Sequence, residues 1–241
     1  MNLIIDVGNT RIKIAVFSGS DLISQEQVSY ENFEKRAIGS IQKLNCKHGI
    51  IGAVGSLENS QLKRIKDKIP LLVLDHKTKI PFNNSYATPK TLGVDRIALV
   101  AAAVTKFPNK NTLIVDAGTC ITYDFVSFEG NYMGGSISPG ISMRYQSLHR
   151  FTDKLPLLKP SNETYDIIGN STERSIHSGV QNGMIIEMEG VIQRYRKKNR
   201  DLTIVLTGGD LYFLSNRLKN GIFANPNFLI EGLNTILTYN L

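Results

Sequence analysis

The sequence predicts an α/β protein of two similarly built halves, each with a mixed β-sheet flanked by helices. The first observation is an internal repeat, in which residues 3–17 align with residues 113–126. Each copy has an apolar run, an Asp where the run ends, a glycine-containing turn and a second β-prone run, which predicts two strands joined by a tight turn. The second observation is that helical and strand-like segments alternate after each repeat, as in layered mixed sheets.

The first half predicts its remaining elements from periodicity and composition. A further β-prone stretch follows the hairpin. The elements expected after it are a helix around 31–45, a strand at 48–56, a helix at 58–68, a short strand at 71–75, a loop at 76–91 and a helix at 92–107. The loop is rich in Pro, Asn and Thr, and loops of this kind often carry binding residues. The last helix is Ala-rich with an apolar stripe, and a turn at 108–111 marks the boundary between the halves.

The second half begins with the repeated hairpin and a third strand, which we expect to break into a Gly/Pro loop within 131–140. The elements expected after it are a helix near 141–150, a loop to about 170, a long helix at 171–198, a buried strand at 202–210 and a final helix at 226–239. Ser171 or Thr172 is the expected N-cap of the long helix.

Composition narrows the class and compartment of the protein. No apolar stretch approaches the roughly 18 residues that cross a bilayer, and the N-terminus lacks a signal-peptide pattern, so we expect a cytoplasmic protein. Cys46 and Cys120 form no CxxC pair and fit reduced thiols. The four histidines have no metal-ligand spacing, which disfavours zinc. The net charge of +7 reflects mainly a solvated basic run at 194–200, although it would also favour capture of a polyanion.

The first turn has the chemistry of a phosphate site. Its potential phosphate ligands are the backbone amides around Gly8 and the side chains of Asn9, Thr10 and Lys13. Asp6 cannot bind phosphate directly and would act through Mg²⁺ or a metal-bound water. The alternative is an ordinary glycine-turn hairpin in which Lys13 lies on a solvent-exposed face, and it explains the same residues. The second copy at 116–119 favours the site, because both halves then direct a carboxylate to one cleft. The sequence contains no Walker loop and no GxGxxG.

Residues 93–96, GVDR, open the Ala-rich helix. Asp95 fits two roles equally well. It could be only an N-cap or first-turn acid, which suits the helix dipole. The same dipole, with Arg96 adjacent, would keep Asp95 ionised near neutral pH, as a general base requires. Arg96 could bind a carboxylate through a bidentate fork.

Glycine-rich segments mark three further places. Residues 134–140 put three glycines and a proline before a helix start, where backbone amides can meet an anion. Residues 207–210, TGGD, offer a similar turn at a strand end, although in isolation a structural turn explains them better. Gly179 and Gly183 favour close helix packing, either across a subunit interface or within one chain.

With these residues assembled, the chain resembles the type III pantothenate kinases, also called the Bvg accessory factor family, of the acetate and sugar kinase, Hsp70 and actin superfamily. The resemblance covers essentially the whole chain. It rests on motifs in the family's order: DVGNT at 6–10, GVDR at 93–96, DAGT at 116–119, GGSISPG at 134–140, NST at 170–172 and TGGD at 207–210. Two departures are small and lie beside the site: Ala15 stands where glycine is common, and Cys120 where alanine is common.

The resemblance implies two duplicated ribonuclease H-like (actin-like ATPase) domains, 1–110 and 111–241, with an active-site cleft between them. It allows the last helix to pack back on the first domain. The implied reaction is ATP-dependent phosphorylation of pantothenate to 4'-phosphopantothenate, the first step of coenzyme A biosynthesis. The implied enzyme is a homodimer with its active site at the subunit interface, without membrane or nucleic-acid partners.

The resemblance also implies residue roles. The ATP-binding residues would be Asp6, Val7, Gly8, Asn9, Thr10, Arg11, Ile12, Lys13 and Thr119. The pantothenate-binding residues would be Tyr86, Gly93, Val94, Asp95, Arg96 and Thr172, with Asp95 as proton acceptor and Thr172 reaching the neighbouring subunit's site. Asp6 would hold Mg²⁺ through water, and Asp116 would bind a monovalent cation, K⁺ or NH₄⁺.

Two other functions remain open. One is a kinase of the same superfamily that acts on another small hydroxylated acid, and Arg96 then favours an acid with a carboxylate. The other is a regulatory or nucleic-acid-binding protein, suggested by the net charge and by the family's second name. No helix-turn-helix, zinc module or aromatic-basic module in the sequence supports this last function.

Overall fold

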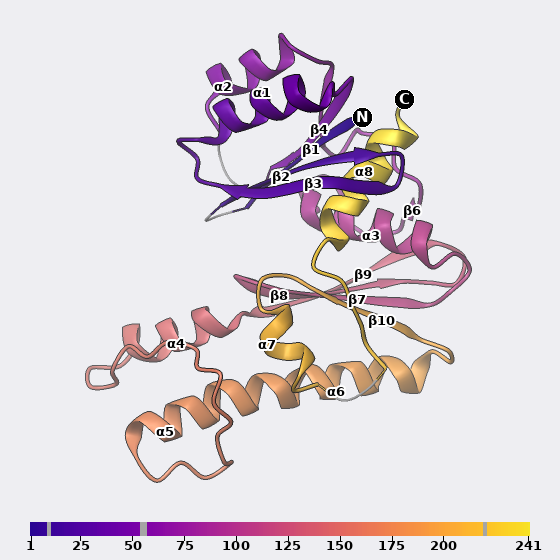
Figure 1. The fold of residues 1–241 in the computed structure, drawn as a ribbon. Coiled ribbons are helices and arrows are strands. Elements are labelled where there is room, and N and C mark those ends of the chain that lie inside the picture. The colour runs from indigo at the N-terminus through magenta and orange to yellow at the C-terminus, as the bar shows by residue number, and fades with distance from the viewer. Residues whose placement is uncertain (9–10, 54–56, 219–220) are drawn as a thin grey trace. The chain divides into compact units, whose positions relative to one another are not determined.

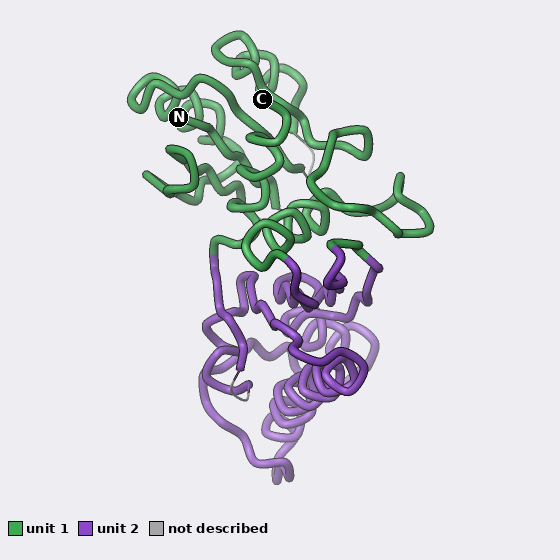
Figure 2. The backbone as a smooth tube through the Cα atoms, turned by 90° about the vertical axis from the view of Figure 1, so that its right-hand side faces the viewer, with its two compact units in different colours: residues 1–108, 130–132, 227–241 green, residues 109–129, 133–226 purple. Residues whose placement is uncertain are grey.

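The computed structural model describes residues 1–8, 11–53, 57–218 and 221–241 and divides into two compact units (Figure 2). Unit 1 contains residues 1–108, 130–132 and 227–241. Unit 2 contains residues 109–129 and 133–226. Each unit has a mixed sheet and a hydrophobic core of its own.

Unit 1 is built on a five-stranded sheet in the order β3-β2-β1-β4-β5 (Figure 1). Its strands are β1 (Asn2–Val7), β2 (Ile12–Ser18), β3 (Asp21–Val28), β4 (His48–Ala53) and β5 (Leu71–Val73). The first three are antiparallel neighbours, whereas β4 pairs in parallel with β1 and β5 in parallel with β4. The predicted hairpin and the mixed sheet of the first half are therefore confirmed.

Helices cover both faces of this sheet. They are α1 (Phe33–Leu44), α2 (Asn59–Lys66), α3 (Val94–Lys106) and α8 (Phe228–Tyr239), with a short 3-10 turn, η1, at Pro89–Thr91. Because side chains alternate along β1, Leu3 and Ile5 pack with α1 on one face. Asn2 points to the other face, where it donates a hydrogen bond to Asn234 of α8 at 3.0 Å. Asp6, which has the same parity as Asn2, lies on that second face.

The Ala-rich composition of α3 is explained by its contact with α8. A Cβ atom at Gly232 of α8 would lie 1.8 Å from the carbonyl oxygen of Ala98, so the two helices meet at a glycine and small side chains. The sequence analysis expected only one apolar stripe of this helix to be buried, and this expectation is too narrow. Every residue of α3 from Arg96 to Ala103 is buried.

Unit 2 is built on the second sheet, in the order β11-β10-β7-β8-β9-β6. Its strands are β7 (Thr112–Ala117), β8 (Cys120–Val126), β9 (Asn131–Pro139), β10 (Thr203–Thr207) and β11 (Phe223–Ala224). The edge strand β6 (Asn83–Asn84) pairs with Asn131 and Tyr132, which belong with it to unit 1. β7 and β8 form the predicted second hairpin, and β10 runs parallel to β7.

The helices of unit 2 pack on one face of its sheet. They are α4 (Ile141–Arg150), α5 (Thr172–His177), α6 (Gly183–Lys198) and α7 (Leu211–Ser215), with a π-helical turn, η2 (Ser178–Asn182), between α5 and α6. Leu113, Val115 and Tyr123 face these helices and form the core with Met184 and Met188 of α6.

Two sequence-based expectations need correction. β9 does not break into a loop at its glycines but continues to Pro139. Gly134 takes φ +96°, and a Cβ at Gly135 would lie 1.6 Å from the carbonyl oxygen of Tyr123, so these glycines let the strand pass close to β8. The helix expected over 171–198 contains the π turn, and α7 and β11 were not predicted. The strand expected over 48–56 is confirmed as β4 from His48 to Ala53, and residues 54–56 of that expectation lie outside the described residues.

The π turn coincides with side chains that bind the preceding loop. Ser178 donates a hydrogen bond from Oγ to the carbonyl of Ile167 at 2.9 Å. Gln181 and Asn182 donate from their side-chain amides to the carbonyls of Ser161 and Tyr165, each at 3.1 Å. Helical periodicity reports only on residues within the helix and cannot detect these tertiary contacts. The sequence therefore predicted a regular helix.

Candidate active site

Asp6 is the penultimate residue of β1, next to the turn that joins β1 to β2. It lies directly opposite Lys13 on β2. Burial raises the pKa of the Asp6 carboxyl to about 6, Lys13 acts to lower it, and Asp95 acts to raise it. A buried carboxyl with a raised pKa is a common feature of functional sites, since a bound cation would restore the favourable environment of its ionised form.

The turn after β1 is described only at its two ends, because Asn9 and Thr10 lie outside the described residues. The amide of Gly8 donates to the carbonyl of Arg11 at 3.1 Å, and the Tyr30 hydroxyl donates to the carbonyl of Gly8 at 2.5 Å. Tyr30 is a contact that the motif did not reveal.

Two of the expected ATP-binding residues are buried side chains. Val7 and Ile12 are 0% exposed and belong to the core of unit 1, so only their backbone groups are available to a ligand. Arg11, in contrast, is exposed, and Lys13 is partly exposed.

Asp95 lies in the first turn of α3, and the N-cap residue is Gly93. The Asp95 Oδ1 atom accepts a hydrogen bond from the amide of Arg96 at 2.8 Å. A Cβ atom at Gly93 would lie 2.3 Å from that oxygen. Glycine at the N-cap therefore leaves room for the carboxylate to fold back over the helix start. Asp95 is a first-turn acid rather than the N-cap, a position that is compatible with either of the roles left open by the sequence.

Arg96 is buried beside two tyrosine rings. Only 6% of the residue is exposed, and its Cζ atom lies 5.5 Å from the ring centroid of Tyr86 and 6.0 Å from that of Tyr132. The two rings stack with their centroids 5.9 Å apart and an interplanar angle of 24°. The structure thus brings the predicted residues Tyr86 and Arg96 together, and it adds Tyr132, which the sequence analysis did not identify.

In unit 2, three of the glycine-containing motifs meet at one place, the DAGT turn at 116–119. The amide of Gly140 donates to the carbonyl of Thr119 at 3.1 Å, and a Cβ at Gly140 would lie 2.0 Å from the carbonyl oxygen of Gly118. On the other side, Gly208 takes φ +99°, and its Cβ would lie 2.4 Å from Oδ1 of Asp116. These contacts explain why glycine is needed at both positions.

The same turn is bordered by polar side chains and a helix start. Gly140 is the N-cap of α4, so the first amides of α4 lie next to the DAGT turn. The amide of Asp210 donates to the carbonyl of Ala117 at 2.9 Å, and burial raises the pKa of the Asp210 carboxyl to about 6. Asp210 therefore resembles Asp6 in being a carboxyl at a glycine turn whose pKa is raised by burial, although Asp210 is only half-buried. The TGGD motif at 207–210, which in isolation is better explained as a structural turn, packs directly against Asp116 through Gly208.

The hydroxyl of Thr122 is a second potential oxygen ligand for a cation near Asp116. The two residues are directly opposite in the β7–β8 ladder, which places their side chains on the same face of the sheet. The Thr122 Oγ1 atom is buried, and among the described residues it has no hydrogen-bond partner. Buried hydroxyls are normally satisfied. A carboxylate and an unsatisfied hydroxyl on one face are suitable oxygen donors for a hard cation.

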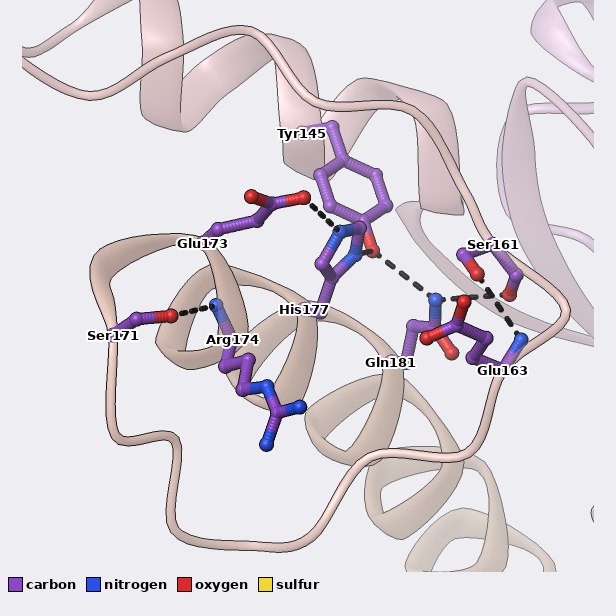
Figure 3. A network of polar contacts seen from close by, with 8 residues as sticks. All are labelled: Tyr145, Ser161, Glu163, Ser171, Glu173, Arg174, His177 and Gln181. Carbon is purple, nitrogen blue, oxygen red and sulfur yellow. Dashed lines mark hydrogen bonds and ion pairs between the residues drawn. The ribbon is translucent and has the colours of Figure 1, made fainter.

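Thr172 begins α5, and Ser171, which is labelled in Figure 3, is the N-cap. The Ser171 Oγ atom accepts a hydrogen bond from the amide of Arg174 at 3.2 Å, which confirms one of the two predicted caps. Thr172 is exposed and lines a groove of about 670 Å³ between α4 and α5, together with Arg144 and Gly179.

A buried polar network holds α5, the helix that begins with Thr172, against α4. Tyr145 Oη and His177 Nδ1 are 2.7 Å apart, and the Gln181 amide donates to the same hydroxyl at 3.3 Å (Figure 3). The ring of Tyr165 stacks on His177 with centroids 4.5 Å apart. These contacts anchor the C-terminal end of α5 and the following π turn, and thereby help to position Thr172 in the lining of the groove.

No group of three or more His, Cys, Asp or Glu side chains within residues 1–8, 11–53, 57–218 and 221–241 is arranged to hold a metal ion. Among the helices of these same residues, none has both the length and the apolar character of a bilayer-spanning segment.

The two mixed sheets flanked by helices form a ribonuclease H-like fold, which solved structures share. A Baf family protein from Campylobacter jejuni superimposes with a TM-score of 0.65 and 22% identity, over 99% of this chain and 98% of its own. A glucokinase from an Antarctic psychrotroph superimposes with a TM-score of 0.55 and 10% identity, over 99% and 98%. The predicted fold class is therefore confirmed.

Sequence comparison then identifies the family. A family model described as type III pantothenate kinase matches residues 2–194. A type III pantothenate kinase from Christiangramia forsetii is 50% identical over 246 positions, which cover 100% of this chain and 99% of the relative. The chain belongs to the type III pantothenate kinase family, and the family resemblance predicted from its motifs is confirmed.

Proposed function

We propose that this protein phosphorylates pantothenate to 4'-phosphopantothenate with ATP, the first step of coenzyme A biosynthesis. Family membership supports the reaction. The observation that carries the assignment of roles is the start of α3, where Asp95 and the buried Arg96 are adjacent and Arg96 lies against two aromatic rings. A carboxylate beside a fixed guanidinium suits a substrate that has both a hydroxyl to activate and a carboxylate to bind.

Asp95 is the proposed proton acceptor. Its carboxylate would orient the primary hydroxyl of pantothenate and accept the proton as phosphoryl transfer proceeds, a contribution of typically 10²–10⁴-fold. Arg96 would bind the pantothenate carboxylate through its planar fork. The resemblance adds Tyr86, Gly93, Val94 and Thr172 as further contacts.

The first turn is the proposed ATP phosphate site. Its described members are Asp6, Val7, Gly8, Arg11, Ile12 and Lys13, and Thr119 of unit 2 is a further proposed contact. Lys13 would neutralise phosphate charge, because positioning and charge neutralisation dominate catalysis of phosphoryl transfer. The buried carboxyl of Asp6 fits a divalent cation held through water. When bound with ATP, Mg²⁺ would supply charge neutralisation at the phosphates.

Asp116 is the proposed ligand of a monovalent cation, K⁺ or NH₄⁺. Support comes from the Thr122 hydroxyl on the same face of the hairpin and from the close packing of Gly208 on the Asp116 carboxylate. These contacts would fix the carboxylate while the cation contributes positive charge.

The protein is also proposed to act as a homodimer in the cytoplasm, with Thr172 reaching the partner's pantothenate. Apart from its chain neighbours and the backbone of its own helix, a Cβ atom at Gly179 or at Gly183 would meet no atom of the described residues within 4 Å. Packing within one chain therefore does not explain these glycines, and Gly179 lines the groove beside Thr172. We further propose that the duplicated halves are 1–110 and 111–241, since each begins with one copy of the hairpin.

The test is identification of the product. Purified protein, ATP and Mg²⁺ are incubated with pantothenate, with the alcohol analogue that lacks the carboxylate, and with other small hydroxylated acids, each in KCl and in NaCl. We expect a phosphorylated product, equimolar ADP and stimulation by potassium with pantothenate, and poor turnover of the alcohol analogue. Preferential phosphorylation of another acid would overturn the substrate assignment, and no ATP-dependent turnover of any acceptor would overturn the kinase assignment.

A further inference from the structure

We propose that Tyr132 is a positioning residue of the acceptor site: its ring, supplied by the first residues of β9, holds Tyr86 and Arg96 in the arrangement that binds the substrate. The inference deepens the proposed function and rests on it. Tyr132 comes from the second half of the sequence, 36 residues after Arg96 (132 − 96), yet it belongs to the same compact unit as that residue.

Tyr132 lies at the centre of an aromatic cluster in unit 1. The residue is 0% exposed. Its ring stacks on Tyr86 and meets Phe82 edge-on, with centroids 6.2 Å apart and an interplanar angle of 78°. The guanidinium carbon of Arg96 lies 6.0 Å from the same ring. One buried side chain therefore contacts two of the residues proposed to bind pantothenate, Tyr86 and Arg96.

The backbone around Tyr132 also fixes the loop that carries Tyr86. The Ser85 amide donates to the Tyr132 carbonyl at 3.0 Å, and the Asn83 amide donates to the Gly130 carbonyl at 3.3 Å. The Asn83 side-chain amide donates to Oδ1 of Asn131 at 3.1 Å. These bonds form the short β6–β9 pairing, so a segment that composition predicted to be a loop is held at its centre.

The physical reason for this arrangement is the burial of a charge. Because only 6% of the Arg96 residue is exposed, its guanidinium needs neighbouring groups that favour its charged form. The faces of aromatic rings provide such an environment, and they also restrict the rotation of a long side chain. If the rings fix the plane of the guanidinium before pantothenate binds, less side-chain freedom is lost on binding. Loss of the Tyr132 ring would then weaken binding of the acceptor selectively.

The first experiment compares steady-state kinetics of Tyr132→Phe, Tyr132→Leu and the wild type. We expect the Phe variant, which keeps the ring, to retain a KM for pantothenate within about twofold of the wild type. The Leu variant should raise that KM roughly tenfold, the scale of a desolvated cation–π contact, with the KM for ATP within about twofold. Phe33→Leu is the matched control, because Phe33 is also 0% exposed in unit 1 but belongs to α1 and packs in the core with Leu3 and Ile5 of β1.

An equal rise of both KM values in Tyr132→Leu, or a rise for pantothenate in Phe33→Leu of the same size, would indicate only general destabilisation and would overturn the inference. An unchanged KM for pantothenate in Tyr132→Leu would overturn it as well.

A second experiment does not depend on the stability of the Leu variant. The chain has no tryptophan, so Tyr132→Trp creates a single fluorescent reporter at this position. We expect pantothenate to change the emission saturably and ATP alone to leave it nearly unchanged. An active variant whose emission ignores pantothenate would overturn the inference while the proposed function stands. A wild-type protein without pantothenate kinase activity would instead overturn the proposed function.

Discussion

Replacement of Asp6 by Asn should stabilise the ligand-free protein while it disables the enzyme. Burial raises the pKa of the Asp6 carboxyl from 3.8 to about 6. The folded state thus binds this proton more tightly than the unfolded state, so the stability that it contributes is present at low pH and is lost as pH rises from about 4 to about 6. The difference between the two pKa values corresponds to about 3 kcal/mol above pH 6.

Asn carries no charge to desolvate and is nearly isosteric with Asp. At pH 7.5 we therefore expect Asp6→Asn to raise the free energy of unfolding by up to about 3 kcal/mol, and at pH 4.5 by only about 1 kcal/mol. For a chain of this length the larger value corresponds to a rise in Tm of roughly 6–12 °C. ATP with Mg²⁺ should stabilise the wild type but not the variant, because the proposed cation ligand is missing.

The assay is thermal unfolding of both proteins at the two pH values, with and without ATP and Mg²⁺, together with turnover of pantothenate. Asp21→Asn is the control, since Asp21 is the exposed first residue of β3 and its replacement should leave Tm unchanged. A variant that is less stable than the wild type at pH 7.5, or a gain in stability that is the same at both pH values, would refute the reasoning.

Four further substitutions test other parts of the site. Asp95→Asn should keep the fold and ATP binding but lower kcat about 100-fold or more, and turnover at the wild-type rate would remove Asp95 as the base. Thr122→Val should raise the KCl concentration for half-maximal stabilisation in thermal melts, and an unchanged potassium response would exclude the hydroxyl from the cation site. Gly208→Ala should lower Tm and the potassium response together, because φ is +99° and the new Cβ would lie 2.2 Å from the carbonyl of Ala117; a normal Tm would argue against this packing. Gly183→Leu should reduce dimer content and pantothenate turnover in parallel, measured by light scattering and kinetics, and a fully active monomer would contradict the shared site.

The sequence predicted local structure well and tertiary contacts poorly, for physical reasons visible at particular residues. The hairpin with Asp6 and the helix that begins near Asp95 depend on short-range patterns, namely strand alternation, glycine turns and helical periodicity. The motifs also pointed to the turns that carry Gly140 and Gly208. Their convergence on Asp116 was not predictable, since it depends on how strands far apart in sequence pair.

The aromatic neighbours of the site were missed for the same reason. Tyr132 lies in an alternating strand segment and looks like an ordinary core residue, and its contact with Tyr86 exists only once β6 pairs with β9. Tyr30 reaches the Gly8 carbonyl from beyond β3, at a distance in sequence that no motif spans. The π turn at 178–182 likewise reflects hydrogen bonds to a preceding loop and not the composition of the helix itself.

The roles proposed for Asp95 and Arg96 are tested most directly by a crystal structure of the protein with pantothenate, Mg²⁺ and a non-hydrolysable ATP analogue. We predict that the primary hydroxyl oxygen of pantothenate lies within about 3.2 Å of the Asp95 carboxylate. In the same complex, the pantothenate carboxylate should be bound by Arg96 and the triphosphate by the turn at 6–13. Pantothenate bound with its hydroxyl away from Asp95, or its carboxylate away from Arg96, would contradict the proposed site.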